Sequence, residues 1–190
     1  MSSPSAEPSS MPDPGDSSRP QGREGNEGVT PRKSPWQVAL AALARREYAR
    51  AELERLLLRK LGAEGKSGAD SAFEGISDEI ARTLDRLRDR GFLSDARMAQ
   101  AWTRSRGARY GRRRLRQDLA WKGVDDGAIS AALPSVDEEE RVALALWQKR
   151  FGHPAATPQE RARQSRFLIA RGFDVEIVRR IVNGPAHEAA

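Results

Sequence analysis

The sequence predicts an all-α protein: three tandem three-helix repeats forming an elongated, curved array, preceded by a disordered N-terminal tail. Apolar residues recur at helical spacing from Trp36 onward, and strand-like alternation is missing. Apolar residues make up only 38% of the chain and charged residues 32%, so the core is thin and favours stacked helices over a sphere. Finally, segments 49 and 62 residues apart resemble one another, as expected for repeats.

Residues 1–35 are expected to form the disordered tail. They hold seven of the eleven prolines, eight serines and no aromatic residue, so they cannot bury enough apolar surface to offset the entropy of ordering. Four basic and five acidic residues lie there, against 33 and 27 in the whole chain. Residues 36–190 therefore carry 29 basic and 22 acidic residues, and the basic character belongs to the folded part.

The first repeat is expected at 36–93. Apolar spacing predicts helices at 36–46, 50–61 and 77–90, the last ending before Gly91, with the glycine-rich segment 62–75 as a loop. Ala49 precedes the second helix, and alanine has no side-chain oxygen to cap a helix start, a loss of roughly 1 kcal/mol.

The second repeat is expected at 94–134 and the third at 135–183, followed by a frayed end, 184–190. The predicted helices of these two repeats lie at 95–108, 111–122, 126–132, 136–151, 158–171 and 175–182. Ser135 with Glu138, and Thr157 with Glu160, match the capping box at two helix starts. Gly123 and Gly172 stand where a left-handed residue ends a helix.

Internal similarity supports this division. A shift of 49 residues lays 119–133 over 168–182, and both segments read as helix, glycine stop, apolar anchor, aspartate cap and short helix. A shift of 62 residues lays 40–60 over 102–122. Each repeat exposes an apolar flank that its neighbour must cover.

The net charge of +6 and the pI near 10.3 predict attraction to polyanions, with nucleic acid and acidic proteins ahead of membrane headgroups. The absence of cysteine excludes disulfides and thiolate metal sites. The N-terminus has no secretory pattern, and the longest apolar run, 38–44, is too short to span a bilayer. We expect a soluble, cytoplasmic protein that is a monomer and has no membrane partner.

Catalytic motifs find little support. Gly-Lys-Ser at 65–67 lacks the glycine spacing and the preceding strand of a phosphate-binding loop, and the acids at 137–140 fit the first turn of a helix, where they complement its dipole. His153 and His187 have no neighbouring partners for general-base chemistry. We therefore expect no enzyme activity, no metal and no cofactor. Core packing is favoured over base stacking for the four tryptophans, at positions 36, 102, 121 and 147.

Residues 104–124 hold eight arginines or lysines and one acid, Asp118. On the helix that starts at Gly111, Leu115 and Leu119 define a narrow buried stripe, so most of the circumference is basic. Neighbouring guanidinium groups repel one another unless a partner supplies negative charge, which favours a binding face over a merely solvated one. Arginine suits both phosphate and carboxylate and does not distinguish them.

The candidate binding residues divide by expected role. Those on the central helix are the main contacts: Arg112, Arg113, Arg114, Arg116 and Lys122. Those in and after the preceding helix assist: Arg104, Arg106 and Arg109, with Tyr110 as a stacking or packing residue. With the arginines of helices 50–61 and 158–171, they are expected to line a basic groove.

Four segments in order, 45–62, 84–106, 111–124 and 167–182, resemble the bacterial regulatory RecX family, most specifically in "GFLSDARMAQAW" and "GRRRLRQDLAWKG". The resemblance covers nearly all of 36–182. It implies three three-helix repeats, no catalytic residue or cofactor, and binding to the RecA recombinase filament on DNA, with inhibition of strand exchange, ATP hydrolysis and coprotease activity. The alternative from the residues alone is a stand-alone basic helical DNA-binding protein.

Overall fold

The computed structural model describes residues 34–62 and 70–184. Within these ranges the chain forms nine α-helices and no strand, which confirms the all-α fold class. Most of the predicted tail and the predicted frayed end from residue 185 lie outside the described residues. No helix in the described ranges is both long and apolar enough to cross a membrane.

The first repeat consists of α1 (Pro35–Leu43), α2 (Arg50–Leu61) and α3 (Asp70–Asp89). Helix α1 starts inside the segment predicted as tail. The Ser34 side chain accepts the Gln37 backbone N–H and the Gln37 side chain accepts the Ser34 N–H, a capping box with Pro35 at the first helical position. A local capping signal therefore overrides the proline-rich composition at this boundary.

Helix α3 also begins earlier than expected, since residues from Asp70 onward were predicted to be loop. The prediction relied on glycine, and Gly75 lies inside the helix. A Cβ built on Gly75 would meet no atom within 4 Å, so the glycine faces open space. One such glycine costs about 1 kcal/mol relative to alanine, which a helix of 20 residues tolerates.

The second repeat consists of α4 (Asp95–Arg106), α5 (Arg112–Lys122) and α6 (Asp126–Ala132). The third consists of α7 (Val136–Arg150), α8 (Pro158–Ile169) and α9 (Val175–Asn183). Both predicted capping boxes, at α7 and α8, are present. Gly123 and Gly172 have φ values of 86° and 81°, the left-handed conformation expected for these helix ends.

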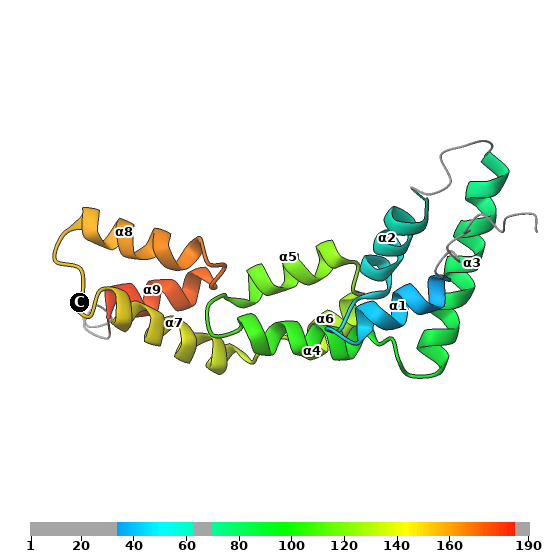
Figure 1. Ribbon diagram of the computed structural model, residues 1–190. Coiled ribbons are helices and arrows are strands. Elements are labelled where there is room, and N and C mark those ends of the chain that lie inside the picture. Colours follow the sequence, from blue (N-terminus) through cyan, green and yellow to red (C-terminus); the bar gives the residue numbers. More distant parts are fainter. Residues whose placement is uncertain (1–33, 63–69, 185–190) are drawn as a thin grey trace, which may run out of the picture. The chain divides into compact units, whose positions relative to one another are not determined.

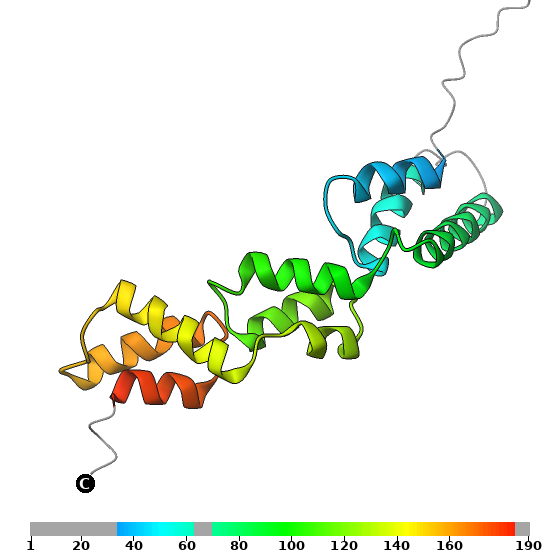
Figure 2. The ribbon, with the colours of Figure 1, turned by 90° about the horizontal axis from the view of Figure 1, so that it is seen from below.

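The closest helix packing lies within each group of three, α1–α3, α4–α6 and α7–α9, which Figures 1 and 2 show in turn along the chain. Each group has its own apolar core. Leu53, Leu57 and Leu84 lie in the first, and Met98 and Leu119 in the second. The third contains Trp147, Leu168 and Phe173 among its buried residues. The sequence therefore folds as three helical modules, each with a small core of its own.

Two joints connect the modules. In the first joint, α2 meets the start of α4 and the end of α5: Asp95 Oδ1 accepts the Arg50 backbone N–H at 2.8 Å, and Arg55 Nη2 donates to the Lys122 carbonyl at 3.0 Å. In the second joint, α5 meets the start of α7 and the end of α8. An acid of one module therefore caps a helix of the module before it.

The second joint repeats this plan. Glu139 Oε1 accepts the Arg112 backbone N–H at 2.9 Å, and Arg113 Nη2 donates to the Ile169 carbonyl at 2.9 Å. As predicted, the Ala49 side chain makes no capping hydrogen bond to α2. Gly111, the N-cap residue of α5, has no side chain to make one either. The missing local caps are supplied across the joints.

Candidate functional site

Helix α5 carries the largest group of candidate binding residues. Leu115 and Leu119 are fully buried, as predicted, and they hold the helix against the second module. Arg113 and Arg114 are exposed, while Arg112 and Arg116 are half-buried. The helix therefore presents some of its arginines to solvent and holds others close to the protein surface.

Acids of α5 itself and of α6 lie close to this basic face. Arg114 pairs with Asp118 at 3.1 Å, and Arg116 pairs with Asp126 and donates to Ser130 Oγ at 3.3 Å. Residues 104–124 contain one acid, Asp118, so the ion pair of Arg116 with Asp126 was not predicted. Part of the prediction of an unbalanced arginine cluster is therefore wrong, because residues just beyond the stretch fold back onto it.

Two of the predicted central contacts also hold the second joint. Arg112 donates from its backbone to Glu139 and from Nη1 to the Pro134 carbonyl at 2.9 Å. Arg113 donates to Ile169, one of the last carbonyls of α8. A guanidinium at a helix C-terminus meets unpaired carbonyls and the negative end of the helix dipole. These arginines thus have structural contacts of their own.

Lys122 is not the outward contact that the sequence predicted. It is 8% exposed, and its Nζ lies 2.9 Å from Glu52 Oε1 and 4.3 Å from the centre of the Trp102 ring. Glu52 is also bound by Arg46, with the closer contact at 2.8 Å. The lysine therefore closes the first joint with a partly buried ion pair and is withdrawn from the proposed binding surface.

The pKa of Glu52 reflects this arrangement. Burial alone would raise it, but hydrogen bonds from Arg46 and Lys122 outweigh burial and lower the pKa. Glu139 shows the opposite balance: burial raises its pKa, and the backbone N–H groups of Arg112 and Asp174 offset only part of that effect. The first joint therefore favours the charged form of its carboxyl group, and the second favours the protonated form.

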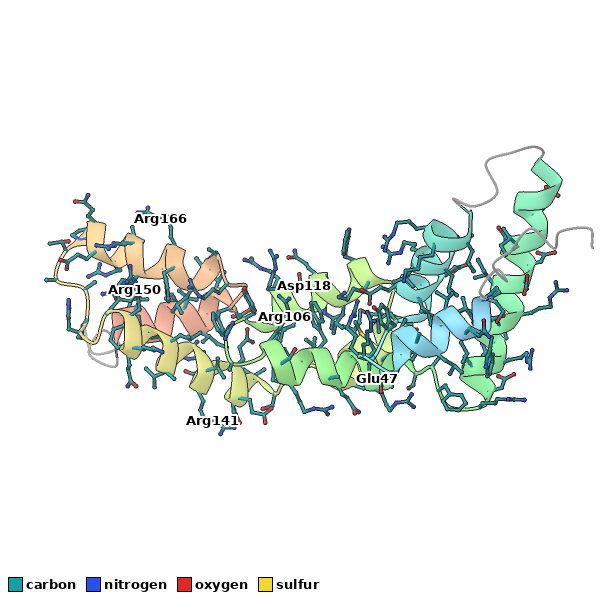
Figure 3. All side chains as sticks on the ribbon, in the orientation of Figure 1. Glu47, Arg106, Asp118, Arg141, Arg150 and Arg166 are labelled. Carbon is teal, nitrogen blue, oxygen red and sulfur yellow. The ribbon has the colours of Figure 1, made fainter. Side chains whose placement is uncertain are left out.

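The arginines around the α4–α5 turn are differently placed. Arg104 and Arg109 are exposed and form no ion pair with any described residue. Arg106 is half-buried, with its guanidinium 4.1 Å from the centre of the Trp102 ring, and Tyr110 is half-buried in the turn. Figure 3 labels Arg106 and Asp118 on this module. Arg104 and Arg109 thus retain uncompensated charge.

The tryptophans fall into two groups. Trp147 is buried and its Nε1 donates to Gln164 Oε1 at 2.8 Å, while Trp36 and Trp102 pack partly buried against their cores, as predicted. Trp121 is 78% exposed, so the prediction of core packing is wrong for it. It follows Leu119 by two residues, about 200° around a helix, and thus lies on the side opposite the buried stripe. That angle was available from the sequence.

The acids at 137–140 do more than complement a dipole. Glu138 completes the capping box of α7, Glu139 caps α5 across the second joint, and Glu140 pairs with Arg180 at 2.7 Å. No group of three potential metal-binding side chains occurs in the described residues. Gly-Lys-Ser at 65–67 and His187 lie outside the described residues, and His153 is exposed in a loop.

Comparisons with known proteins identify the family. Residues 94–133 match the second three-helix domain of RecX, and residues 137–182 match the third. Regulatory protein RecX of Leptothrix cholodnii is 41% identical over 152 residues, which cover 79% of this chain and 88% of that protein. This chain belongs to the RecX family.

Other RecX proteins agree. Regulatory protein RecX of Ralstonia nicotianae is 38% identical over 147 residues, covering 77% of this chain and 84% of that protein. The crystal structure of RecX from Lactobacillus salivarius matches with a TM-score of 0.61 over 78% of this chain and 92% of that one, at 20% identity, and so supports the fold alone. The resemblance read from the four sequence segments is confirmed. RecX proteins are named as regulatory proteins, and a regulatory, all-helical family favours a role without catalysis.

Proposed function

We propose that this RecX-family chain binds the RecA recombinase filament on DNA as a cytoplasmic monomer and inhibits strand exchange, ATP hydrolysis and coprotease activity, with no chemistry of its own. Family membership supports a regulatory role. The observation that carries the proposal is the pair Arg104 and Arg109, which are exposed and have no ion-pair partner in the described ranges. Their charge favours a polyanionic partner.

The contact set is narrower than the sequence suggested. Arg104 and Arg109 are the main proposed contacts. Arg114 and Arg116 would leave Asp118 and Asp126 and bind anionic groups of the partner instead. Guanidinium groups bind phosphate and carboxylate through paired N–H donors, so DNA phosphates and RecA carboxylates are both chemically suitable. The other members of the proposed surface are Arg106, Tyr110, Arg112 and Arg113, the last two of which also hold the second joint.

The test reverses the two uncompensated charges. In the variant Arg104→Glu/Arg109→Glu, the concentration that half-inhibits the DNA-dependent ATPase of RecA should rise by about tenfold or more, since contacts to charged groups contribute about 1.5–3 kcal/mol each. Helical content by circular dichroism should stay unchanged, because both side chains are exposed.

The matched control is Arg82→Glu/Arg141→Glu, which changes the net charge equally at exposed positions on α3 and α7. Arg141 points away from α7 in Figure 3. The control variant should inhibit like the wild type. Equal potency of all three proteins would remove the second module from the proposed interface, and failure of the wild-type chain to inhibit RecA would overturn the proposed function itself.

The alternative is a stand-alone DNA-binding protein, favoured by the fact that exposed arginines and a net charge of +6 can attract DNA without any recombinase. In that case log affinity for naked duplex should fall with log salt with a slope of about −0.9 per phosphate contacted. Tight, sequence-dependent binding at near-physiological salt would favour this alternative. Weak binding together with strong inhibition of RecA would favour the proposed function.

A further inference from the structure

Trp121 is the most exposed large apolar side chain in the described part of the chain, at 78%. It lies in the last turn of α5, and leaving an indole in water forgoes one of the largest burial gains available to a side chain. The helix turns its opposite side, with Leu115 and Leu119, into the core. The indole is therefore available to a partner.

Arg55 borders the exposed indole. Its guanidinium lies 5.7 Å from the centre of the Trp121 ring, and the same group donates to the carbonyls of Trp121 and Lys122 at 3.3 and 3.0 Å. These hydrogen bonds hold the arginine in place without neutralising its charge. A positive charge is thus fixed beside an aromatic face before any partner binds.

Polar residues of α5 share this side. Arg114 and Gln117 precede Trp121 by seven and four residues, which places both within about 40° of it around the helix. Arg114 is paired with Asp118, and its side chain is still 53% exposed. The indole therefore stands at the end of a cationic and amide-bearing stripe two turns long.

The surroundings discriminate between classes of partner. The other exposed large apolar side chains of the described residues are Phe92, Val136, Leu144 and Val175, and none of them lies on α2 or α5. A protein hot spot is normally enclosed by contacts that exclude water, and a membrane-bound helix needs a continuous apolar face. A single aromatic ring among arginines instead matches surfaces that stack nucleic-acid bases.

We infer that Trp121 is a stacking platform for an unpaired base of single-stranded DNA, with Arg55 and Arg114 bordering the adjacent phosphates. The inference rests on the proposed function in taking DNA as part of the bound assembly. A base within a duplex already has both faces covered by its neighbours, so only an unpaired base offers a free face. Every base has such a face, so the site should tolerate any sequence.

The experiment measures binding of a fluorescein-labelled 12-nucleotide oligothymidine by anisotropy at low salt, without recombinase. Trp121→Ala should weaken binding by about tenfold, and Trp121→Phe, which keeps a smaller ring, by less. Binding of the unlabelled oligonucleotide should quench the tryptophan fluorescence of the wild type and leave that of Trp121→Phe nearly unchanged. Val175→Ala, which shortens another exposed apolar side chain, is the matched control and should bind like the wild type.

An abasic 12-mer, which keeps the phosphates and lacks the bases, should bind the wild type and Trp121→Ala equally. The inference is overturned if Trp121→Ala binds oligothymidine as tightly as the wild type, or if it loses as much affinity for the abasic strand. A variant that binds DNA normally and no longer associates with RecA would instead make Trp121 a protein contact. Because these titrations contain no recombinase, their outcome is separate from inhibition of RecA by the wild-type chain.

Discussion

The two joints between the modules share one plan and differ in what holds it closed. At the first joint, Lys122 reaches from the second module to Glu52 in the first. The 62-residue and 49-residue shifts place Arg114 and Arg171 at the matching positions of the second joint, where an arginine replaces the acid. Arg171, in the turn after α8, instead folds back onto the end of that helix: it donates to the Phe167 carbonyl at 3.2 Å and covers the Phe167 ring.

The second joint compensates with backbone contact. The Gly111 N–H donates to the Arg171 carbonyl at 3.0 Å, and the Arg113 N–H donates to the Gly172 carbonyl at 3.2 Å. The matching residue of the first joint is Ala49, which is fully buried in the core of the second module. The first joint therefore depends on a partly buried ion pair between side chains, and the second on the absence of a side chain at Gly111.

The largest effect is expected from adding a methyl group to the second joint. In Gly111→Ala the new Cβ would lie 2.5 Å from Phe173 Cα and would clash with the Gly172 carbonyl. Both are backbone groups, which cannot move aside as a flexible side chain could. The joint must open, and we expect about 3 kcal/mol less free energy of unfolding from overpacking and two weakened hydrogen bonds. Urea unfolding followed by circular dichroism measures this.

The matched substitution at the first joint is Ala49→Gly. It removes one buried methyl group and keeps a residue that is acceptable at an N-cap, so the loss should be about 1 kcal/mol. Equal losses for Gly111→Ala and Ala49→Gly would contradict the distinction between the joints.

An intermediate effect is expected from the ion pair. Lys122→Ala leaves Glu52 partly buried with Arg46 as its remaining partner, so the free energy of unfolding should fall by about 2 kcal/mol, less than for a fully isolated charge. Arg171→Ala at the matching position removes a contact between a turn and the end of the helix before it, and should cost less than about 1 kcal/mol. The same urea titration measures both variants.

A double-mutant cycle isolates the pair. Lys122→Met and Glu52→Gln should together cost less than the sum of the two single changes, because the second substitution removes a charge that the first has left without its partner. Strict additivity would show that Lys122 stabilises the protein through packing on Trp102 alone.

The sequence was sufficient for features that depend on local signals. Capping boxes, glycine stops and helical periodicity located the helices, and the internal shifts found the repeats that the cores then confirmed. Gly75 misled the prediction because its consequence depends on what faces it, and open space makes it harmless. Ser34 and Pro35 were a readable local signal inside a segment assigned by composition.

The candidate site was harder to predict because its charges are settled by tertiary contacts. The partner of Lys122 is Glu52, 70 residues earlier, and the sequence around either residue does not indicate that the two pair. Asp126 lies 10 residues after Arg116 and Glu139 lies 27 residues after Arg112, so both fall outside the basic stretch 104–124. The exposure of Trp121, in contrast, could have been predicted from the sequence. Its position around the helix, two residues after Leu119, already placed it on the side away from the core. Sequence alone therefore located the basic module and could not assign each charge.

The smallest expected effects concern pH, and they have opposite signs at the two joints. The pKa of Glu52 is lowered in the fold, because hydrogen bonds from Arg46 and Lys122 outweigh the effect of burial. Its charge therefore stabilises the protein above the unfolded-state pKa, and this stabilisation is lost as the pH falls through the folded-state value. Glu52→Gln should reduce the free energy of unfolding by about 1 kcal/mol at neutral pH, and the deficit should shrink on acidification.

Glu139 is expected to affect stability in the opposite direction from Glu52 as the pH changes. Because burial raises its folded-state pKa, the fold favours the protonated carboxyl, and ionisation on going to neutral pH costs stability. Glu139→Gln keeps one oxygen that accepts the Arg112 N–H and removes the buried charge, but it loses the second oxygen that accepts from the Asp174 N–H. The net gain in the free energy of unfolding at neutral pH should therefore stay below about 1 kcal/mol. That gain should vanish as the pH falls below the unfolded-state pKa, where both proteins are neutral at this position. Unfolding curves of the two glutamine variants between about pH 7 and pH 3 test this, since differences of the same sign at neutral pH would mean that the two carboxylates play the same role in their joints.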